Sequence, residues 1–313
     1  KDINIQGKQA ELVTVKAKLS NIKIPYLSVK DDFGGIKRLS YKNTLISDNF
    51  SLKKYVFLET DIANLEAKGV KLDIDEEGGI TREAITISEE IDPYTTEDEN
   101  SLIKWLLSKS RFELLPAIEV RNYIRKAVGK LLRKHSVAEL FQLKFSLRDK
   151  ISRSIESYLN SYAEIQFDKL LKEKRLVLDL KQSFAIPLSL DIYNPHPEIF
   201  KRSIYERVGR LNNEEYRLAK AIDDLPNIKW WFRNSDRDGF YIQGYLPHSF
   251  NPDFILETKT GCIIAVEYKG EHLADREYKE KIGNIWGGIN DNYKFIMATK
   301  SDIEEKVKAI EKL

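Results

Sequence analysis

One segment in the middle of the chain places the strongest limit on its fold. Between Ser136 and Leu171 there are 36 residues without glycine or proline. Apolar side chains recur there at intervals of three and four residues, which is typical of amphipathic helices. The segment therefore predicts either one long helix or two helices joined at a break that the pattern does not locate.

Sequence patterns on either side of this segment divide the chain into three predicted regions. Residues 1–95 contain alternating β-branched side chains and paired glycines, which predicts a β-rich region. Residues 96–198 are expected to be mainly helical, and the prolines within residues 183–200 predict a linker at their end. Residues 199–313 combine strand and helix patterns. The fold class expected is α/β for this last region and α+β for the whole chain, whose 313 residues fit two or three domains.

Charge is sorted along the chain although its total is close to neutral. The chain carries 51 basic and 49 acidic residues. Residues 59–99 contain 14 acidic and 3 basic side chains, whereas residues 121–175 contain 14 basic and 6 acidic ones. The basic stretch is expected to follow a phosphate backbone. The alternatives are that both stretches are solvated surface, or that they pack on each other.

The composition indicates the cellular compartment in which the protein works. A single cysteine, Cys262, excludes a disulfide framework and argues against zinc fingers. No apolar run reaches the ~18–20 residues that span a bilayer, and the first residues contain no apolar signal core. These features predict a cytoplasmic protein without a membrane partner. Because the chain lacks an initiator methionine, we expect it to be a piece of a longer protein.

The residues with the clearest chemical meaning lie between 251 and 270. The sequence NPDFILETKTGCIIAVEYKG predicts a strand, a turn and a second strand that is apolar enough to be buried in a sheet. Asp253 begins the first strand, and Glu267 and Lys269 stand near the end of the second. Residues two apart share one face of a strand, and a hairpin places the start of one strand beside the end of the next. Asp253, Glu267 and Lys269 are therefore expected to converge.

Two converging carboxylates repel each other, and a divalent cation relieves that repulsion. Mg²⁺ suits one or two carboxylates together with water and substrate phosphate, and a bound metal lowers the pKa of its water. Lys269 is expected to orient this water or to stabilise the charge that develops on a phosphate. The alternative is that Asp253 caps a strand while Glu267 and Lys269 form an exposed pair.

This stretch resembles the core of PD-(D/E)XK nucleases, carried here by Pro252-Asp253 and Glu267-Tyr268-Lys269. Residues 200–300 are similar to the carboxy-terminal nuclease region of type III restriction enzyme restriction subunits, which are ATP-dependent DNA translocases. The segments that carry this similarity are NNEEYRLAKAIDDLPNIKWWFRN, FYIQGYLPHSFNPDFI, AVEYKGEH and KEKIGNIW. The resemblance implies a restriction-endonuclease-like domain at residues 199–313, in which helices flank a mixed sheet. Residues 1–95 and 96–198 would then be connector regions between motor and nuclease.

The resemblance also implies an acidic residue on the helix that precedes the first strand. Glu214 and Glu215 are both available. In the family pattern, Asn is followed after two residues by Glu, and after two more by an apolar residue and Ala. Asn212, Glu215, Leu218 and Ala219 fit this spacing, so the resemblance selects Glu215. The backbone carbonyl of Tyr268 is implied as a further metal ligand. The alternative for both glutamates is an ordinary role as acids in the first turn of a helix.

Basic residues near the motif are expected to contact nucleic acid. Lys279 and Lys281 lie on a predicted helix after the second strand and are expected to reach phosphate. Arg233 follows a predicted strand and is expected to contact nucleic acid or to pair with a carboxylate near the site. His272 follows the motif closely enough to enter the site. The alternative for the lysines is a solvated surface position.

Substrate, cofactor and partners follow from the resemblance. Double-stranded DNA is the implied substrate, Mg²⁺ is the cofactor, and Mn²⁺ is expected to substitute for it. A methylating modification subunit and an upstream helicase motor are the implied partners, in a restriction–modification system that defends against phage. The sequence contains no GxxxxGK[ST] loop, so we expect no ATP site in this chain.

Two alternatives stand beside the hypothesis of a Mg²⁺-dependent DNA endonuclease. In the first, the nuclease fold is degenerate and the chain is a module that binds DNA or a partner. In the second, which is compatible with cleavage, residues 96–180 form a structural connector that transmits the position of the motor to the nuclease.

Overall fold

The computed structural model describes two compact units of the protein. The described residues are 10–16, 22–46, 50–55, 68–74, 80–86, 98–110, 112–269 and 273–313. The sheet unit combines Lys1–Leu45 with Gln166–Leu313, and the helical unit comprises Ile46–Ile165. Among the helices that the structure describes, none has the length and apolar character needed to cross a membrane.

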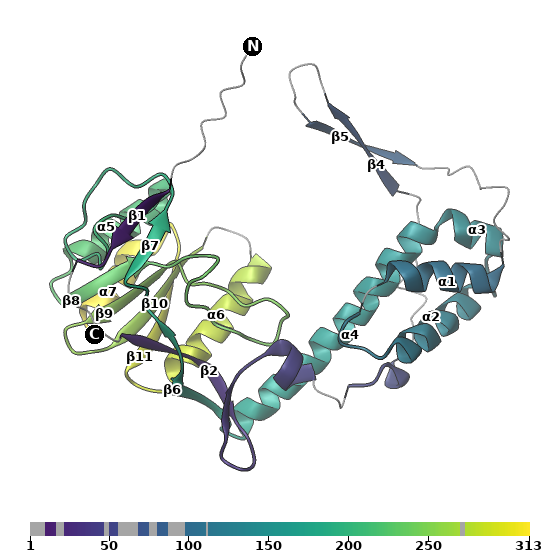
Figure 1. Ribbon diagram of the computed structural model, residues 1–313, viewed down its shortest axis with the longest axis horizontal. Coiled ribbons are helices and arrows are strands. Elements are labelled where there is room, and N and C mark those ends of the chain that lie inside the picture. The colour runs from purple at the N-terminus through teal and green to yellow at the C-terminus, as the bar shows by residue number, and fades with distance from the viewer. Residues whose placement is uncertain are drawn as a thin grey trace. The chain divides into compact units, whose positions relative to one another are not determined.

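The described part of the helical unit contains three α-helices, the first part of a fourth and a hairpin (Figure 1). These elements are α1 (Glu99–Lys109), α2 (Ala117–Leu131), α3 (Val137–Gln142), α4 (Lys144–Lys172), and the antiparallel pair β4 (Lys68–Ile74) and β5 (Ile80–Thr86). On α4, Leu147, Ile151 and Ile155 are fully buried at intervals of four residues. This spacing places them on one face of the helix, as the apolar pattern predicts.

The segment without glycine or proline forms two helices rather than one. Leu143 separates α3 from α4, with a φ of −98° and a ψ of 8°. Ser136 and Glu139 form a capping box that begins α3, because each side chain satisfies a backbone N–H that the helix leaves free. One boundary between the two compact units falls within the sequence of α4, between Ile165 and Gln166.

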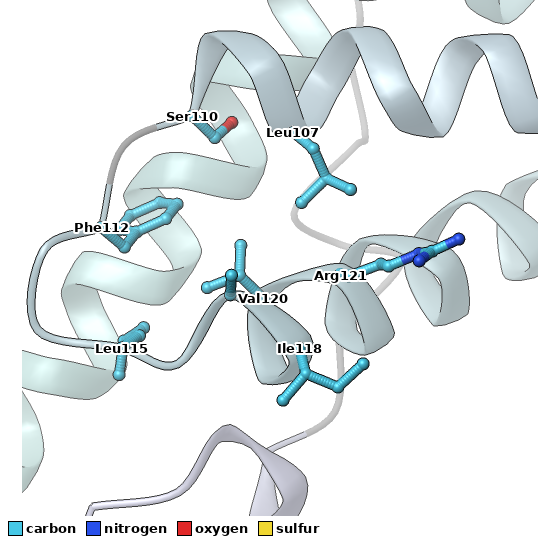
Figure 2. Close-up of a pocket in the computed structure, with 8 residues that line it drawn as sticks. Leu107, Ser110, Phe112, Leu115, Ile118, Val120 and Arg121 are labelled. Carbon is cyan, nitrogen blue, oxygen red and sulfur yellow. The ribbon is translucent and has the colours of Figure 1, made fainter.

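An apolar hollow of about 400 Å³ lies in the helical unit, between α1, α2 and the loop that joins them. Its wall includes Leu107 from α1, Phe112 and Leu115 from the loop, and Val120 and Arg121 from α2 (Figure 2). None of the candidate site residues predicted from the sequence lines this hollow. It is therefore separate from the predicted chemistry.

The sheet unit is built around a four-stranded mixed sheet in the order β11-β10-β9-β8. Its strands are β8 (Ile228–Arg233), β9 (Phe254–Thr258), β10 (Ile263–Tyr268) and β11 (Tyr293–Ala298). Neighbouring strands are antiparallel except β10 and β11, which are parallel and are joined through a helix, as a parallel connection requires. The predicted strand, turn and strand at residues 251–270 is confirmed in β9 and β10.

Helices cover both faces of this sheet, so the predicted arrangement of helices flanking a mixed sheet is confirmed. On one face, α5 (Asn213–Asp224) and α7 (Ile303–Glu311) pack with the sheet in a core that includes Phe254 and Val266. On the other face, α6 (Leu273–Gly288) lies so close to β11 that a Cβ atom at Gly283 would be 2.4 Å from the Phe295 ring.

Two smaller sheets join the beginning of the chain to residues that follow α4. β1 (Glu11–Thr14) pairs with β7 (Ser189–Ile192), and β2 (Lys23–Lys30) pairs with β6 (Leu176–Ala185) and β3 (Ile36–Arg38). The sheet unit is therefore discontinuous in sequence. It does not coincide with any of the three consecutive regions predicted at residues 1–95, 96–198 and 199–313.

The linker predicted at residues 183–200 is wrong in part, because residues 183–185 belong to β6 and residues 189–192 form β7. Pro187 lies between β6 and β7, and Pro195 and Pro197 lie beyond β7. The prolines bound these strands rather than interrupt them, since a proline is tolerated where no ladder hydrogen bond is needed from its nitrogen. The strands that pair with β6 and β7 lie near the beginning of the chain, far from them in the sequence, and no local pattern reveals this.

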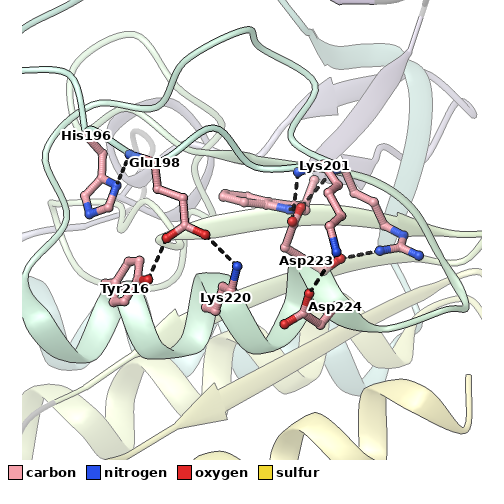
Figure 3. A network of polar contacts seen from close by, with 9 residues as sticks. His196, Glu198, Lys201, Tyr216, Lys220, Asp223 and Asp224 are labelled. Carbon is pink, nitrogen blue, oxygen red and sulfur yellow. Dashed lines mark hydrogen bonds and ion pairs between the residues drawn. The ribbon is translucent and has the colours of Figure 1, made fainter.

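A buried carboxylate ties α5 to the preceding segment and to β8. Asp223 is 1 % exposed and accepts hydrogen bonds from the backbone N–H groups of Lys201 (2.8 Å) and Arg202 (2.7 Å) and from Trp231 Nε1 (2.9 Å). In the same region Glu198 accepts hydrogen bonds from two side chains of α5 (Figure 3). These contacts fix the helix on which Glu215 lies.

Replacing Asp223 with asparagine is expected to destabilise the protein by about 2–4 kcal/mol. The amide NH₂ would face one of the backbone N–H groups whose hydrogen bonds the carboxylate now accepts, which leaves buried donors unpaired. Asp224→Asn is the matched control, because Asp224 is half exposed and forms a 3.7 Å ion pair with Lys201. Urea unfolding followed by tryptophan fluorescence measures both, and equal midpoints for the two variants would contradict this role of Asp223.

Candidate functional site

The pairing of β9 with β10 places Asp253 and Glu267 opposite each other. Phe254 and Val266 are the last pair of the β9–β10 ladder, and the same register continued by one residue sets Asp253, just before β9, opposite Glu267, whose charge acts on it. Directly opposed residues of an antiparallel pair lie on the same face, with Cβ atoms about 4.5–5.5 Å apart. The two carboxylates therefore meet at the end of the sheet where β9 begins and β10 ends.

Backbone and side-chain hydrogen bonds fix the position of Asp253. Its Oδ2 accepts a hydrogen bond from the N–H of Tyr268 (2.7 Å), and its carbonyl accepts one from the N–H of Asn234 (2.8 Å). The buried amide of Asn234 donates to the carbonyls of Phe240 (2.7 Å) and Pro252 (2.9 Å). Asn234 thus holds both sides of the loop that leads into β9, a role that the sequence analysis missed because the residues it joins are 6 and 18 positions away.

Glu267 is buried with one carboxylate oxygen paired and the other unpaired within the described part of the chain. The residue is 3 % exposed. Its Oε1 accepts a hydrogen bond from Lys279 Nζ (2.7 Å), whereas its Oε2 has no hydrogen-bond partner among the described residues. A buried, unpaired carboxylate oxygen is costly, so this atom is available to a ligand that carries positive charge.

The surroundings of Asp253 and Glu267 disfavour the ionisation of both carboxylates at once. Burial raises the pKa of Asp253 to about 7, and the charge of Glu267 adds to the rise, against the Tyr268 hydrogen bond. Burial also raises the pKa of Glu267, against the opposing effect of Lys279. A bound cation would reverse both effects, because it favours the ionised form of each group.

The donor atoms at this point fit a hard divalent cation. Asp253 and Glu267 offer carboxylate oxygens, and the backbone carbonyl of Tyr268 lies next to Glu267 in β10. Magnesium is bound in this way in proteins, by one or two carboxylates with waters and substrate oxygens. Within the described part of the chain, no group of three or more metal-binding side chains comes together. Any ion here would therefore be held by two carboxylates and not by a closed protein cage.

Glu215 contacts a residue at the start of its own helix and a residue of β8. Its Oε2 accepts hydrogen bonds from the N–H of Asn212 (3.0 Å) and from Arg233 Nη2 (3.2 Å). The first contact is the helix-terminal role that was the alternative for this residue. The second pairs Arg233 with a carboxylate, which was one of the two roles expected for it, whereas its contact with nucleic acid stays a prediction. Glu214 instead lies near Arg217 (3.6 Å) and Lys300 (3.8 Å).

The lysine of the motif does not contact the paired carboxylates. Lys269 Nζ donates to Asp275 on α6, and this hydrogen bond lowers the pKa of Asp275. Asp275 was absent from the predicted site. Its position four residues before Lys279 on one helix is the sequence signal that relates it to the site, because such residues are neighbours on a helix surface.

The two lysines predicted to reach phosphate have different surroundings. Lys279 extends from α6 to Glu267 and is mostly shielded from solvent. Lys281 lies over the ring of Tyr245 (4.8 Å from Nζ to the centroid) and 3.8 Å from Asp168. The structure therefore brings Lys279 to the carboxylate pair and gives Lys281 other contacts. His272 lies outside the described residues.

Comparison with known proteins returned no relative of this chain. No protein-family model matches it, and no curated protein or solved structure does. Its function is therefore inferred from the side chains of the site and from the motif they form.

Replacing Asp253 with asparagine is expected to flatten the dependence of stability on pH in the absence of metal. The pKa of Asp253 is about 7 in the folded protein against 3.8 ordinarily, so the folded state binds the extra proton and loses stability as the pH rises through this interval. An asparagine side chain at this position would carry no such penalty. The stability of Asp253→Asn relative to wild type should rise by about 2 kcal/mol between pH 5 and pH 8.

Urea unfolding in EDTA at both pH values measures this difference, with Asp236→Asn as the control at an exposed aspartate. A difference between Asp253→Asn and wild type that stays constant from pH 5 to pH 8 would contradict the burial of an ionisable Asp253.

Proposed function

We propose that the chain is a metal-dependent endonuclease of the PD-(D/E)XK class that hydrolyses phosphodiester bonds of double-stranded DNA. The observation that carries this proposal is the opposition of Asp253 and Glu267 at adjacent strand ends, with Glu267 Oε2 buried and unpaired among the described residues. The motif lysine follows two residues later. Helices on both faces of a mixed sheet agree with the fold that the motif implies.

In this proposal Asp253, Glu267 and the Tyr268 carbonyl hold Mg²⁺, for which Mn²⁺ substitutes. When bound, the ion supplies Lewis acidity and lowers the pKa of a coordinated water. Asp253 is pre-positioned for this by the Tyr268 and Asn234 N–H groups. Glu267 is pre-positioned by burial in β10.

The lysines would act on the water and the phosphate. Lys269 orients the attacking water and offsets the charge that develops on the phosphate. The bond between water oxygen and phosphorus forms as the opposite P–O bond breaks, the water gives up a proton to solvent, and the leaving oxygen takes up a proton from solvent. Lys269 must leave Asp275 to do this, and the exposure of about a fifth of its side chain gives it access. Glu215, paired with Arg233, contributes negative charge near Asp253.

We further propose that the chain is the carboxy-terminal part of a type III restriction subunit. In this proposal a helicase motor precedes it in the full protein, and a methylating modification subunit accompanies it. Double-stranded DNA reaches the nuclease through the motor, in a system that degrades phage DNA. The chain itself carries no GxxxxGK[ST] loop, so ATP would act elsewhere in the assembly.

One observation favours a second candidate, a binding module with a degenerate nuclease fold. Lys269 is paired with Asp275, and Lys279 is paired with Glu267. A site whose lysines are held by its own carboxylates, and are not free to act on a phosphate, would bind DNA without cutting it. Cleavage assays on variants separate the two candidates.

Lys269→Ala and Glu267→Gln are each expected to reduce cleavage of supercoiled plasmid by about 100-fold or more. Each removes a group that acts on the reacting phosphate or on its metal. The assay compares nicked and linear products in Mg²⁺, Mn²⁺ and EDTA, with and without ATP. Glu267→Gln should still retard DNA in a binding gel, because its effect is on chemistry.

Lys308→Ala is the control, because Lys308 is an exposed lysine on α7 and should cut like wild type. Metal-independent cleavage, or full cleavage by Lys269→Ala, would contradict the nuclease proposal. Tight, salt-sensitive DNA binding with no cleavage by the wild type would favour the binding module. ATP is expected to change neither result.

A further inference from the structure

We propose that Lys279 is a built-in counter-cation of the metal site, whose ammonium group neutralises Glu267 in the metal-free protein and is displaced when a divalent cation binds. This inference rests on the metal site of the proposed function. It gives Lys279 a different role from the phosphate contact predicted from the sequence, and it makes metal binding a competition between two cations for one carboxylate.

The contact between Lys279 and Glu267 has the features of a structural ion pair. Nζ lies 2.7 Å from Oε1, and the exposed side-chain fractions are 18 % for Lys279 and 4 % for Glu267. Such a pair, removed from most of the solvent, is stabilising only if both partners stay. Loss of either one leaves the other charge buried alone.

The position of Lys279 is imposed by the fold. Gly283 and Gly287, one and two turns further along α6, allow the helix to lie directly against β11. A helix held this closely carries Lys279 to the end of β10 whether or not a ligand is present. Lys269, in contrast, pairs with Asp275, so Lys279 is the ammonium group that contacts Glu267.

The ionised side chains around the site carry a net charge of one negative unit. Asp253, Glu267, Asp275 and Glu215 carry four negative charges when ionised, and Lys269, Lys279 and Arg233 carry three positive ones. A divalent cation at Glu267 Oε2 would overcompensate this balance and would repel the adjacent ammonium group. The ion on Oε2 and Lys279 on Oε1 therefore compete for the negative charge of one carboxylate.

A second position for the displaced ammonium group exists beside the first. Lys279 Nζ lies 3.9 Å from Asp275 and 5.4 Å from the centroid of the Phe250 ring. A carboxylate and an aromatic face both attract an ammonium ion. A small rotation of the side chain toward them would free Glu267 and keep Lys279 neutralised.

Mn²⁺ binding without DNA tests this proposal, because it needs no catalytic turnover. Binding is measured by the loss of the free Mn²⁺ signal in electron paramagnetic resonance. Lys279→Met removes the competing charge, so it should bind Mn²⁺ about tenfold more tightly than wild type, which corresponds to about 1.4 kcal/mol. Lys279→Arg keeps the charge and should bind like wild type.

Thermal unfolding supplies a second readout. In EDTA, Lys279→Met should melt about 4 °C below wild type, because Glu267 is left without its partner. Saturating Mn²⁺ should remove this difference. Lys306→Met is the matched control, since Lys306 has a carboxylate partner of its own, Asp302, at the start of a different helix, and it should leave Mn²⁺ affinity unchanged.

Equal or weaker Mn²⁺ binding by Lys279→Met would overturn the counter-cation role while leaving the metal site intact. Absence of Mn²⁺ binding in wild type and in every variant would instead contradict the proposed metal site, and the counter-cation role with it. If Lys279→Met fails to fold in EDTA, recovery of folding on addition of Mn²⁺ would support the proposal, and failure to recover would overturn it.

Discussion

The electrostatic conflict between Asp253 and Glu267 determines how the rest of the site is arranged. The register of β9 and β10 places the two carboxylates opposite each other, where burial and mutual repulsion oppose ionisation. The Tyr268 N–H partly offsets this conflict at Asp253, and Lys279 does so at Glu267. One carboxylate oxygen still lacks a partner among the described residues. In the function proposed above, a cation binds at this oxygen.

The fold holds this unfavourable pair in place through packing on both sides of the sheet. The core beneath α5 and α7 fixes β9 and β10 on one face, and on the other face α6 packs closely against β11, the neighbour of β10. Asn234 holds the loop that leads to Asp253. The strands at the beginning of the chain complete the unit, because Trp286 on α6 donates a hydrogen bond to the carbonyl of Pro25 on β2.

Much of the site's framework could be predicted from local sequence, whereas most of its side-chain contacts could not. Alternation along 251–270 is enough to place Asp253 and Glu267 together, because a hairpin pairs nearby residues. The partners of Lys269 and Lys279 depend on how α6 is rotated against the sheet, which no spacing specifies. The pairing of β2 with β6 joins segments far apart in the chain, so local patterns predict a linker where β6 ends. The break at Leu143 has no turn residue to mark it.

The central claim is that Asp253 and Glu267 form a divalent-cation site, and the most direct measurement is an anomalous difference map from crystals soaked in Mn²⁺. The account predicts a manganese peak bonded to carboxylate oxygens of both residues, with Lys279 Nζ moved from Glu267 toward Asp275. A map in which manganese occupies other positions on the protein while these two carboxylates remain without it would contradict the account.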